Sequence, residues 1–565
     1  MSEWGTSEAA ARFRRTARTA LDVLLELDPA AASALGDHRF DDRLADRSRQ
    51  GAAACLDGLS AAIGALDDLD DTAMGPQDVV DLELLRGRLT ATQWSITDLG
   101  EHTWNPLVHL PGDAVHALVS RDTGDPDERA TALVARLAAV PRSLASARET
   151  LGEMPRVHVE TAITQTRGAI ALLGGPVESL LGRAPGRRAD VDGARGPAAE
   201  ALEQHARWLT DQLPAAERSP RLRPEAYAAR LWAALDTETG PDALLTRAES
   251  DLMALEEQLA DLTGRLAPLL GVDAPAAGRV RAVMDAVAAG APTTDEDVLD
   301  QCVTQLGELT ELVRLHDLVT VPDELAGSTR VIEMPEVDRG ISVAYCDPPG
   351  ALEPGGPYAT FFAVSPTPRD WSPDQVASFY REYNGHMLRN LTAHEAMPGH
   401  VLQLGHARRF AGTTPVRAAL SSGTLIEGWA VYAEQLIADA VERDAPTDPA
   451  TMCLRLQQLK MRLRCTINAI LDVRVHTRGM TEAEAMSLMC ERGHQEAGEA
   501  AGKWRRALLT SAQLSTYYVG MGEVSALAED LAAARPGAGT RRVHDELLSH
   551  GSPSPRLLRG LLDLA

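Results

Sequence analysis

The chain has 565 residues, of which 44% are hydrophobic and 24% charged, a composition typical of a folded globular protein. Its net charge of −26 and its pI near 5.0 argue against nucleic acid or anionic membrane as a partner, because those surfaces attract clustered positive charge. Six cysteines are scattered without a C-x-x-C pair, so neither a disulfide framework nor a thiolate zinc site is indicated.

The first residues, "MSEWGTSEAAARFRRTARTALDVLLEL", lack the apolar core of a signal peptide and have the pattern of an amphipathic helix. No run of 18 apolar residues indicates a membrane span. With only 4% aromatic residues and abundant Ala, Leu, Arg and Glu, the composition favours helices over sheets. We therefore expect a mainly α-helical protein located in the cytoplasm, with no membrane partner.

The residue pattern of the sequence changes near residue 328. Before it, amphipathic helical patterns alternate with Pro, Gly and Asp clusters such as "GDHRFDDRLADRS". After it come "STRVIEMP", "GISVAYC" and "PYATFFAV", short segments rich in Val, Ile, Tyr and Phe that predict a small β-sheet. The last segment is a core strand or, alternatively, an edge strand that binds substrate by strand addition. We expect one domain over residues 1–565 in two lobes, a helical lobe at 1–325 and a catalytic lobe with the sheet at 326–565.

Helix signals follow the predicted sheet. Ser372 with Gln375 predicts a capping box and a helix from about residue 373, which should end near Asn384. The stretch "PATMCLRLQQLKMRLRCTINAILDVRVHTRG" predicts a long helix that stops at Gly479. "TEAE", residues 481–484, predicts a second capping box.

The segment "HEAMPGH", residues 394–400, begins like the zinc-protease motif H-E-x-x-H but places its histidines six positions apart instead of four. On a straight helix, His394 and His400 would point about 120° apart and lie about 9 Å apart along the axis, too far for one metal ion. Pro398 lacks a backbone N–H and crowds the carbonyl of His394, while Gly399 accepts unusual dihedral angles. We therefore predict a bend that brings both imidazoles to one metal ion. The alternative is a kinked, capped helix with surface histidines.

A catalytic zinc ion takes three protein ligands and keeps one position for water. "TLIEGWAVYAEQ", residues 424–435, offers Glu427, and Glu434 follows on nearly the same helical face. We predict Glu427 as the third ligand, Glu434 as a carboxylate that orients a histidine, and Glu395 as the general base. The alternative for Glu427 and Glu434 is a solvated helix face. His406 is the reserve ligand if His400 turns away.

Two further groups fit a hydrolase. His476 lies in the last turn of its predicted helix, where the carbonyl ends favour a protonated imidazole that donates to an oxyanion. "STYYVGMG" offers Tyr517 and Tyr518, either of which could donate through its phenol. The alternatives are a plain helix-terminal histidine and a tyrosine of the core.

At these residues the sequence resembles the bacterial family called domain of unknown function 885, or DUF885. The family pattern H-E-x-x-P-G-H, E-G-W-x-x-Y-x-E, D-x-x-x-H and Y-x-x-G is found here as "HEAMPGH", "EGWAVYAE", "DVRVH" and "YYVG". The early "LGDHRFDDRL" also resembles the family, so the resemblance covers nearly the whole chain. That family is similar to helical gluzincin metallopeptidases, including thermostable carboxypeptidase Taq and angiotensin-converting enzyme. The resemblance implies a helical gluzincin-like fold with a deep groove, the metal at its floor and a small sheet beside it. It also implies ligand roles for His394, His400 and Glu427, a base role for Glu395, and transition-state roles for His476 and Tyr517.

We therefore expect a zinc-dependent hydrolase of peptide or amide bonds, a carboxypeptidase-like metallopeptidase that uses metal-bound water with Glu395 as general base. Zn²⁺ is the expected cofactor, and a peptide or small amide is the expected substrate. The alternative is a non-catalytic helical binding protein with a structural metal site.

Overall fold

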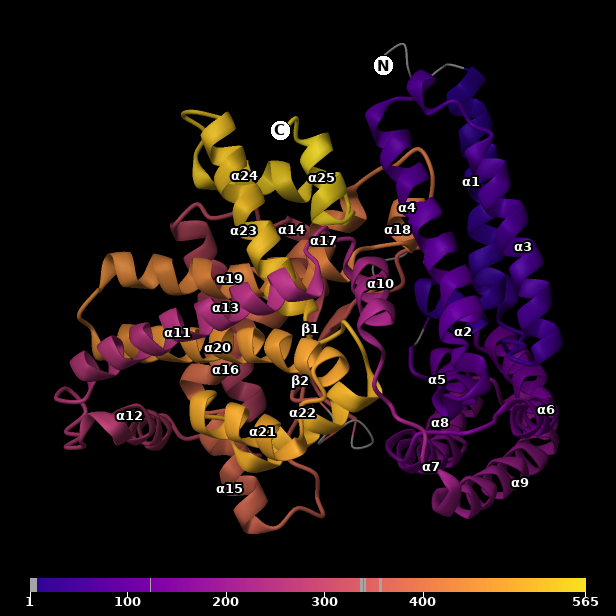
Figure 1. Ribbon diagram of the computed structural model, residues 1–565, viewed down its shortest axis with the longest axis horizontal. Helices are drawn as coiled ribbons and strands as arrows, with labels where there is room; N and C mark the ends of the chain where they lie inside the picture. Colours follow the sequence, from indigo (N-terminus) through magenta and orange to yellow (C-terminus); the bar gives the residue numbers. More distant parts are fainter. Residues whose placement is uncertain (1–7, 122, 336–338, 340–341, 355–357, 565) are drawn as a thin grey trace. The chain divides into compact units, whose positions relative to one another are not determined.

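The computed structural model describes residues 8–121, 123–335, 339, 342–354 and 358–564 (Figure 1). The protein is mainly helical and has a three-stranded sheet, so the expected fold class is confirmed at this level. None of the described helices combines the length and the apolar character that crossing a membrane requires. The chain forms two compact units, and the first comprises Met1–Pro220, Pro349–Tyr358 and Gly412–Leu420.

The first unit is built from helices packed through apolar stripes. The long helices α1, α3 and α4 run alongside one another (Figure 1), and α6, α7 and α9 form a second group. Its helices are α1 (Glu8–Leu27), α2 (Pro29–Leu35), α3 (Arg49–Asp67), α4 (Pro76–Trp94), α5 (Gly112–Val119), α6 (Pro126–Thr150), α7 (Arg156–Leu172), α8 (Gly175–Arg183), α9 (Arg188–Gln212) and α18 (Val416–Ala419). The helix expected at the N-terminus is confirmed from Glu8, and residues 1–7 lie outside the described residues.

The second unit contains the small sheet and the remaining helices. Its first helices are α10 (Pro224–Leu235), α11 (Pro241–Leu266), α12 (Ala276–Gly290), α13 (Val298–Leu315) and α14 (Asp323–Ser328). Those around the predicted site are α15 (Pro373–Glu382), α16 (Gly385–Glu395), α17 (His400–Arg409), α19 (Gly423–Asp444) and α20 (Pro449–Thr477). The last are α21 (Glu482–Ser487), α22 (Ala497–Leu509), α23 (Thr516–Ala534), α24 (Thr540–Leu548) and α25 (Pro555–Leu561).

The bounds of the two units differ from those of the expected lobes, which were residues 1–325 and 326–565. Helices α10 to α13 belong to the second unit, because their apolar faces complete its cores. On α11, for example, Leu252 and Leu259 lie on one helical face and share a core with Leu456 and Leu463 of α20. Helical periodicity alone predicts the buried face but not the helix it packs against.

The sheet consists of β1 (Thr329–Glu333), β2 (Ala344–Asp347) and β3 (Thr360–Val364) in the order β1-β3-β2. The three predicted strand segments are confirmed, although residues 340, 341 and 357 of those segments lie outside the described residues. β3 is parallel to β1 and antiparallel to β2, so it is the central strand. The prediction that a substrate adds as a strand to β3 is therefore wrong, because both edges of β3 are already paired with other strands.

The capping signals are confirmed. Ser372 and Thr481 each form a capping box, with Gln375 and Glu484 respectively. Gly479, with φ +67°, follows the end of α20. Asn384 does not close the helix before it, as was expected, since α15 already ends at Glu382; its side chain instead caps the N-terminus of α16.

The segment 412–420 is held in the first unit by a buried ion pair. Arg417 and Asp81 have side chains that are each 1% exposed, and the Arg417 Nη2 lies 2.8 Å from the Asp81 Oδ1. Thr414 Oγ1 donates to the other Asp81 oxygen at 2.6 Å, and Gln77 O accepts from the guanidinium at 2.8 Å. Removing either partner of such a pair leaves an uncompensated buried charge.

Two imidazoles of the first unit are buried with ring nitrogens that have no hydrogen-bond partner among the described residues. His205 is 0% exposed, and neither of its ring nitrogens has a hydrogen-bond partner among the described residues. His158 is 2% exposed and packs its ring against Trp104. Burial lowers the pKa of each to about 4, because a charged imidazole would lose its hydration.

We predict that acid destabilises the protein through these two histidines. Their pKa is lower in the folded than in the unfolded chain, so the unfolded chain binds more protons between about pH 6.5 and pH 4. Stability should be fully present above pH 6.5 and fall by about 3 kcal/mol per histidine as the pH drops to 4. Denaturation curves at pH 7.5 and 5.0 measure this loss. His205→Leu should reduce the difference, whereas His116→Leu, at an exposed position, should not.

Candidate metal centre

The H-E-x-x-P-G-H segment does not form one bent helix but two helices with a break between them. α16 ends at Glu395 and α17 begins at His400, and the Met397–Pro398 peptide is cis. A Cβ at Gly399 would lie 1.7 Å from the carbonyl oxygen of His394, so only glycine fits at this position. The Trp429 indole N–H donates to the Pro398 carbonyl at 2.8 Å and so attaches α19 to the break.

The break brings the two histidines together with Glu427. Nε2 of His394 and Nε2 of His400 each lie 3.5 Å from Oε2 of Glu427. The two imidazole rings are perpendicular, with centroids 4.8 Å apart. One ligand atom from each of these three residues lies within 4.8 Å of the others. The structure thus assembles the three residues predicted as metal ligands.

This donor set fits a zinc ion. Ligand atoms held tetrahedrally at about 2.1 Å from one ion are about 3.4 Å apart, close to the histidine–carboxylate separations found here. Oε2 of Glu427 and Nδ1 of His400 are buried, and neither has a hydrogen-bond partner among the described residues. Two imidazoles and one carboxylate also form the ligand set of several catalytic zinc sites.

Glu434 orients His394, as predicted. Its Oε1 lies 2.7 Å from His394 Nδ1, which therefore carries the proton and leaves the Nε2 lone pair directed at Glu427. The Glu434 side chain is fully buried, and its other oxygen accepts a hydrogen bond from the Asn390 amide. This supporting shell fixes both the tautomer and the direction of the ring.

The electrostatics of the cluster suit a cation. Burial opposes a charged His394, but the nearby carboxylates of Glu427 and Glu434 raise its pKa above the ordinary value. Burial likewise opposes ionised Glu427, whereas the two histidines lower its pKa. The cluster therefore favours a positive charge between the imidazoles and the carboxylate, which a divalent ion would provide.

Glu395 lies beside the cluster and is held by the sheet. Its charge contributes to the raised pKa of His394, and its Oε2 accepts the backbone N–H of Cys346 in β2 at 3.1 Å. β2 is an outer strand of the sheet, so the sheet edge next to the cluster belongs to β2 rather than to β3.

Tyr517 and Tyr518 have different surroundings. Burial and then the charge of Glu427 raise the pKa of Tyr517 to about 12, and its hydroxyl lies 3.4 Å from Nη2 of Arg506. The Tyr518 hydroxyl instead donates to Asp251 of α11 at 2.6 Å. Because the Tyr518 phenol is engaged by Asp251, Tyr517 stays the predicted site tyrosine.

Tyr517 reaches this position because α19 and α23 cross at two glycines. A Cβ on Gly428 would lie 2.4 Å from the backbone of Gly520, and a Cβ on Gly520 would lie 2.3 Å from the Thr424 carbonyl oxygen. The glycines of E-G-W and Y-x-x-G therefore allow the backbones of the two helices to touch. This contact places Glu427 and Tyr517 on adjoining helices at the same level.

His476 has a structural environment away from the cluster. Its Nδ1 accepts the Leu222 backbone N–H at 3.1 Å, so its Nε2 carries the proton and donates to the Thr510 carbonyl at 2.9 Å. Burial lowers its pKa to about 4, so the prediction of a protonated imidazole is wrong. Desolvation of this buried ring outweighs the stabilisation expected from the end of the helix. Both nitrogens are used, and neither is available to an oxyanion.

The other half of the D-x-x-x-H motif also has a positioning role. Asp472 is completely buried and accepts hydrogen bonds from the backbone N–H groups of Ala512 and Ser515 and from the Ser515 hydroxyl. These residues immediately precede α23. Asp472 therefore holds the loop from which the Tyr517 helix starts.

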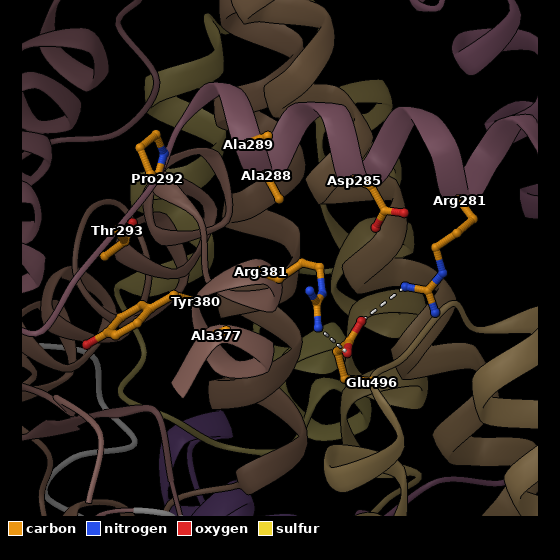
Figure 2. Close-up of a pocket in the computed structure, with 10 residues that line it drawn as sticks. All are labelled: Arg281, Asp285, Ala288, Ala289, Pro292, Thr293, Ala377, Tyr380, Arg381 and Glu496. Atoms are coloured by element: carbon orange, nitrogen blue, oxygen red, sulfur yellow. Dashed lines mark hydrogen bonds and ion pairs between the residues drawn. The ribbon is translucent and has the colours of Figure 1, made fainter. Parts of the chain in front are cut away.

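The reserve ligand His406 is not part of the cluster, since its Nε2 contacts the Thr320 carbonyl at 2.7 Å. A pocket of about 720 Å³ in the second unit lies between α12, α15 and the start of α22 (Figure 2). Its Arg281 and Arg381 both pair with Glu496. No lining residue that the structure describes belongs to the metal cluster, so we do not assign the site to this pocket.

Sequence analysis missed Asn390, the Cys346 N–H and the role of Asp472. Asn390 lies four residues before His394 on the same helical face, and that spacing could have indicated it. The Cys346 contact uses a backbone group, so its residue type carries no signal.

The fold and the cluster define a mainly helical protein with a His-His-Glu arrangement of zinc-ligand type. The chain belongs to the family described as "Bacterial protein of unknown function (DUF885)", whose model matches residues 29–562. No curated protein matches the chain.

Two solved structures are similar over nearly their whole length. A "putative lipoprotein of unknown function" from Shewanella oneidensis is 26% identical with a TM-score of 0.82, covering 97% of this chain and 99% of that chain. A "putative lipoprotein" from Colwellia psychrerythraea is 15% identical with a TM-score of 0.77, covering 98% of each chain. The second likeness concerns the fold alone.

We predict that Gly520→Ala destabilises the protein. The added methyl group collides with backbone atoms of α19, which cannot rotate away, so the free energy of unfolding should fall by about 2 kcal/mol or more. Chemical denaturation followed by circular dichroism measures the change. Gly502→Ala in α22 is the matched control, because nothing lies within 4 Å of its added Cβ and alanine favours the helix. Equal stability of the two variants would refute the close crossing.

Proposed function

We propose that this protein is a zinc-dependent hydrolase of peptide or amide bonds, with a gluzincin-like fold and a carboxypeptidase-like activity. The observation that carries the proposal is the convergence of His394 and His400 on Glu427, with the Glu395 carboxylate beside them. In such an enzyme the cluster would lie at the floor of a substrate groove.

The proposed roles follow from the contacts of each side chain. His394, His400 and Glu427 would hold Zn²⁺, which when bound supplies a Lewis acid that polarises a carbonyl and makes water more acidic. Glu395, held by the Cys346 N–H, accepts the proton of the attacking water and passes it to the leaving nitrogen. The raised pKa of Tyr517 keeps its phenol protonated at neutral pH, so it can donate to the developing oxyanion.

The number of ligands favours a catalytic over a structural site. Structural zinc sites are closed by four protein ligands, whereas His394, His400 and Glu427 supply three ligand atoms among the described residues. A fourth position would remain for water or substrate. A non-catalytic binding protein with a structural metal is therefore the weaker alternative.

The first test is metal content. Purified wild-type protein should bind about one zinc ion per chain, and Glu427→Gln should lower the affinity for zinc by at least about 10-fold, because it removes a charged ligand. His406→Ala should retain zinc, since its imidazole contacts the Thr320 carbonyl instead. Elemental analysis after dialysis measures both. Zinc retained equally by all three proteins would reject the assigned ligands.

The second test separates catalysis from binding. Glu395→Gln should keep its zinc but lose about 100-fold or more of the peptide-cleaving activity, because the amide cannot accept a proton. Digestion of a peptide library with and without a chelator, analysed by mass spectrometry, measures the wild-type activity and its metal dependence. A zinc-loaded wild type that cleaves no peptide would favour the binding protein, and an active Glu395→Gln variant would reject the base.

A further inference from the structure

The segment "LGDHRFDDRL", residues 35–44, is not part of the candidate metal centre but packs against a segment far along the chain. We call these ten residues the N-terminal motif. The Leu35 carbonyl accepts the Leu352 backbone N–H at 2.7 Å. A Cβ on Gly36, where φ is +87°, would lie 2.4 Å from the backbone nitrogen of Glu353. The two backbones therefore touch at a place where only glycine fits.

The contacting segment belongs to the connection between β2 and β3. This connection runs from residue 348 to residue 359, far longer than a hairpin loop of about two to five residues, so its own turn does not set the register of β2. β2 has four residues and pairs with β3 on one edge. On its other edge the Cys346 N–H donates to Glu395 at 3.1 Å. A short strand with so long a connection needs an anchor outside the sheet.

His38 supplies a polar link at this anchor. Its Nδ1 lies 2.8 Å from Oδ2 of Asp41, and its Nε2 lies 3.2 Å from Oε1 of Glu353. Ionised carboxylates only accept hydrogen bonds, so both ring nitrogens must donate, and this requires the charged imidazolium. A neutral ring would turn a lone pair toward one of the two carboxylates. The Asp41 and Glu353 side chains are 10% and 4% exposed, so water does not readily replace the lost bond.

The charges around His38 favour its cationic form. The hydrogen bond with Asp41 raises the pKa of His38 to about 9 against the opposing effect of burial, and Glu353 adds to the rise. Other charged groups near this link are Asp37, Arg129 and Arg136. The stability that the link contributes is fully present below about pH 6.5 and is lost as the pH rises through about 9.

We propose that His38 is a positioning residue for Glu395, because it ties the β2–β3 connection to the N-terminal motif and so keeps the Cys346 N–H in place. The role of Glu395 rests on the proposed function, whereas the hold on β2 is measurable without any activity. The link acts along the chain, since Glu353 follows Asp347, the last residue of β2, by six positions. Without it the end of β2 moves, and Glu395 loses the donor that fixes its carboxylate.

Hydrogen exchange of the full-length protein, followed by mass spectrometry of a peptide that contains Ala344–Asp347, tests this hold. His38→Gln should speed exchange of the β2 amides by about 10-fold at pH 7, the effect of losing one hydrogen bond to a charged group, while α9 keeps its wild-type exchange. His38→Lys should stay close to wild type, because an ammonium group donates to both carboxylates. Glu353→Gln removes the other end of the link and should match His38→Gln.

His316→Gln is the matched control, because it removes an imidazole that lies 3.0 Å from the Asp444 carboxylate in the second unit and should leave β2 unchanged. Unaltered exchange of β2 in both His38→Gln and Glu353→Gln would overturn the proposal. Faster exchange spread evenly through the first unit would also overturn it, since that result means a general loss of stability. If His38→Gln does not fold, Glu353→Gln gives the answer alone.

Cleavage of the library peptides by the zinc-loaded protein tests the effect on Glu395. His38→Gln should lower kcat by about 10-fold with KM and zinc content unchanged, because it alters neither the ligands nor the peptide contacts. In wild type, kcat should fall as the pH rises through about 9, and His38→Lys should move this fall to higher pH, because an ammonium group loses its proton later. A fall at the same pH in His38→Lys would refute the positioning role.

The two measurements separate this inference from the proposed function. If wild type cleaves no peptide, the proposed function fails, and the exchange of the β2 amides still shows whether His38 holds the strand. If wild type cleaves peptides but β2 exchange is the same in His38→Gln, the proposed function stands and His38 has no positioning role.

Discussion

The candidate site depends on the close passage of the chain at residue 399 over the carbonyl of His394. A side chain at this position would occupy the place of that oxygen, so the chain can turn from α16 into α17 only with glycine there. Pro398 adds the second constraint, since it cannot continue the hydrogen bonding of α16. Together these residues end one helix at the first imidazole and start the next at the second. The six-residue spacing is thus converted into two side chains that face one carboxylate.

The E-G-W-x-x-Y-x-E motif of α19 serves several neighbours at once, because successive residues of a helix point about 100° apart. Glu427 faces the histidines and Gly428 faces α23, while Trp429 reaches the break before α17. Tyr432 donates to His544 of α24, and Glu434 returns to the face of Glu427 to hold His394. One helix therefore connects the ligands, their support and the helix of Tyr517. This accounts for a motif in which five of the eight positions have a definite residue type.

The sequence predicts those features that depend on interactions between residues close together in the chain. The capping boxes at Ser372 and Thr481 and the three strands were predicted from neighbouring residues. Pro398 predicted a bend in one helix, where the structure has a break between two helices. Contacts between segments far apart in the chain were not predicted. The central place of β3 depends on pairing order, which strand composition does not encode. His476 was misjudged because its burial beneath the loop at Thr510 overrides the effect of its helix end. The pairing of Arg506 with Tyr517 also depends on tertiary packing of α22 against residues beyond its own end.

The path of the chain between the ligands has a consequence for how this protein can be divided. Between His400 and Glu427 the chain enters the first unit, where Arg417 is buried against Asp81, and then returns. The segment between β2 and β3 makes a similar excursion. A single cut after Pro220 would therefore separate Pro349–Tyr358 and Gly412–Leu420 from the rest of the first unit. In the C-terminal fragment Arg417 would then lack its partner Asp81. Gene fission or the transplantation of one half onto another scaffold is thus disfavoured, and the two units are expected to be inherited together.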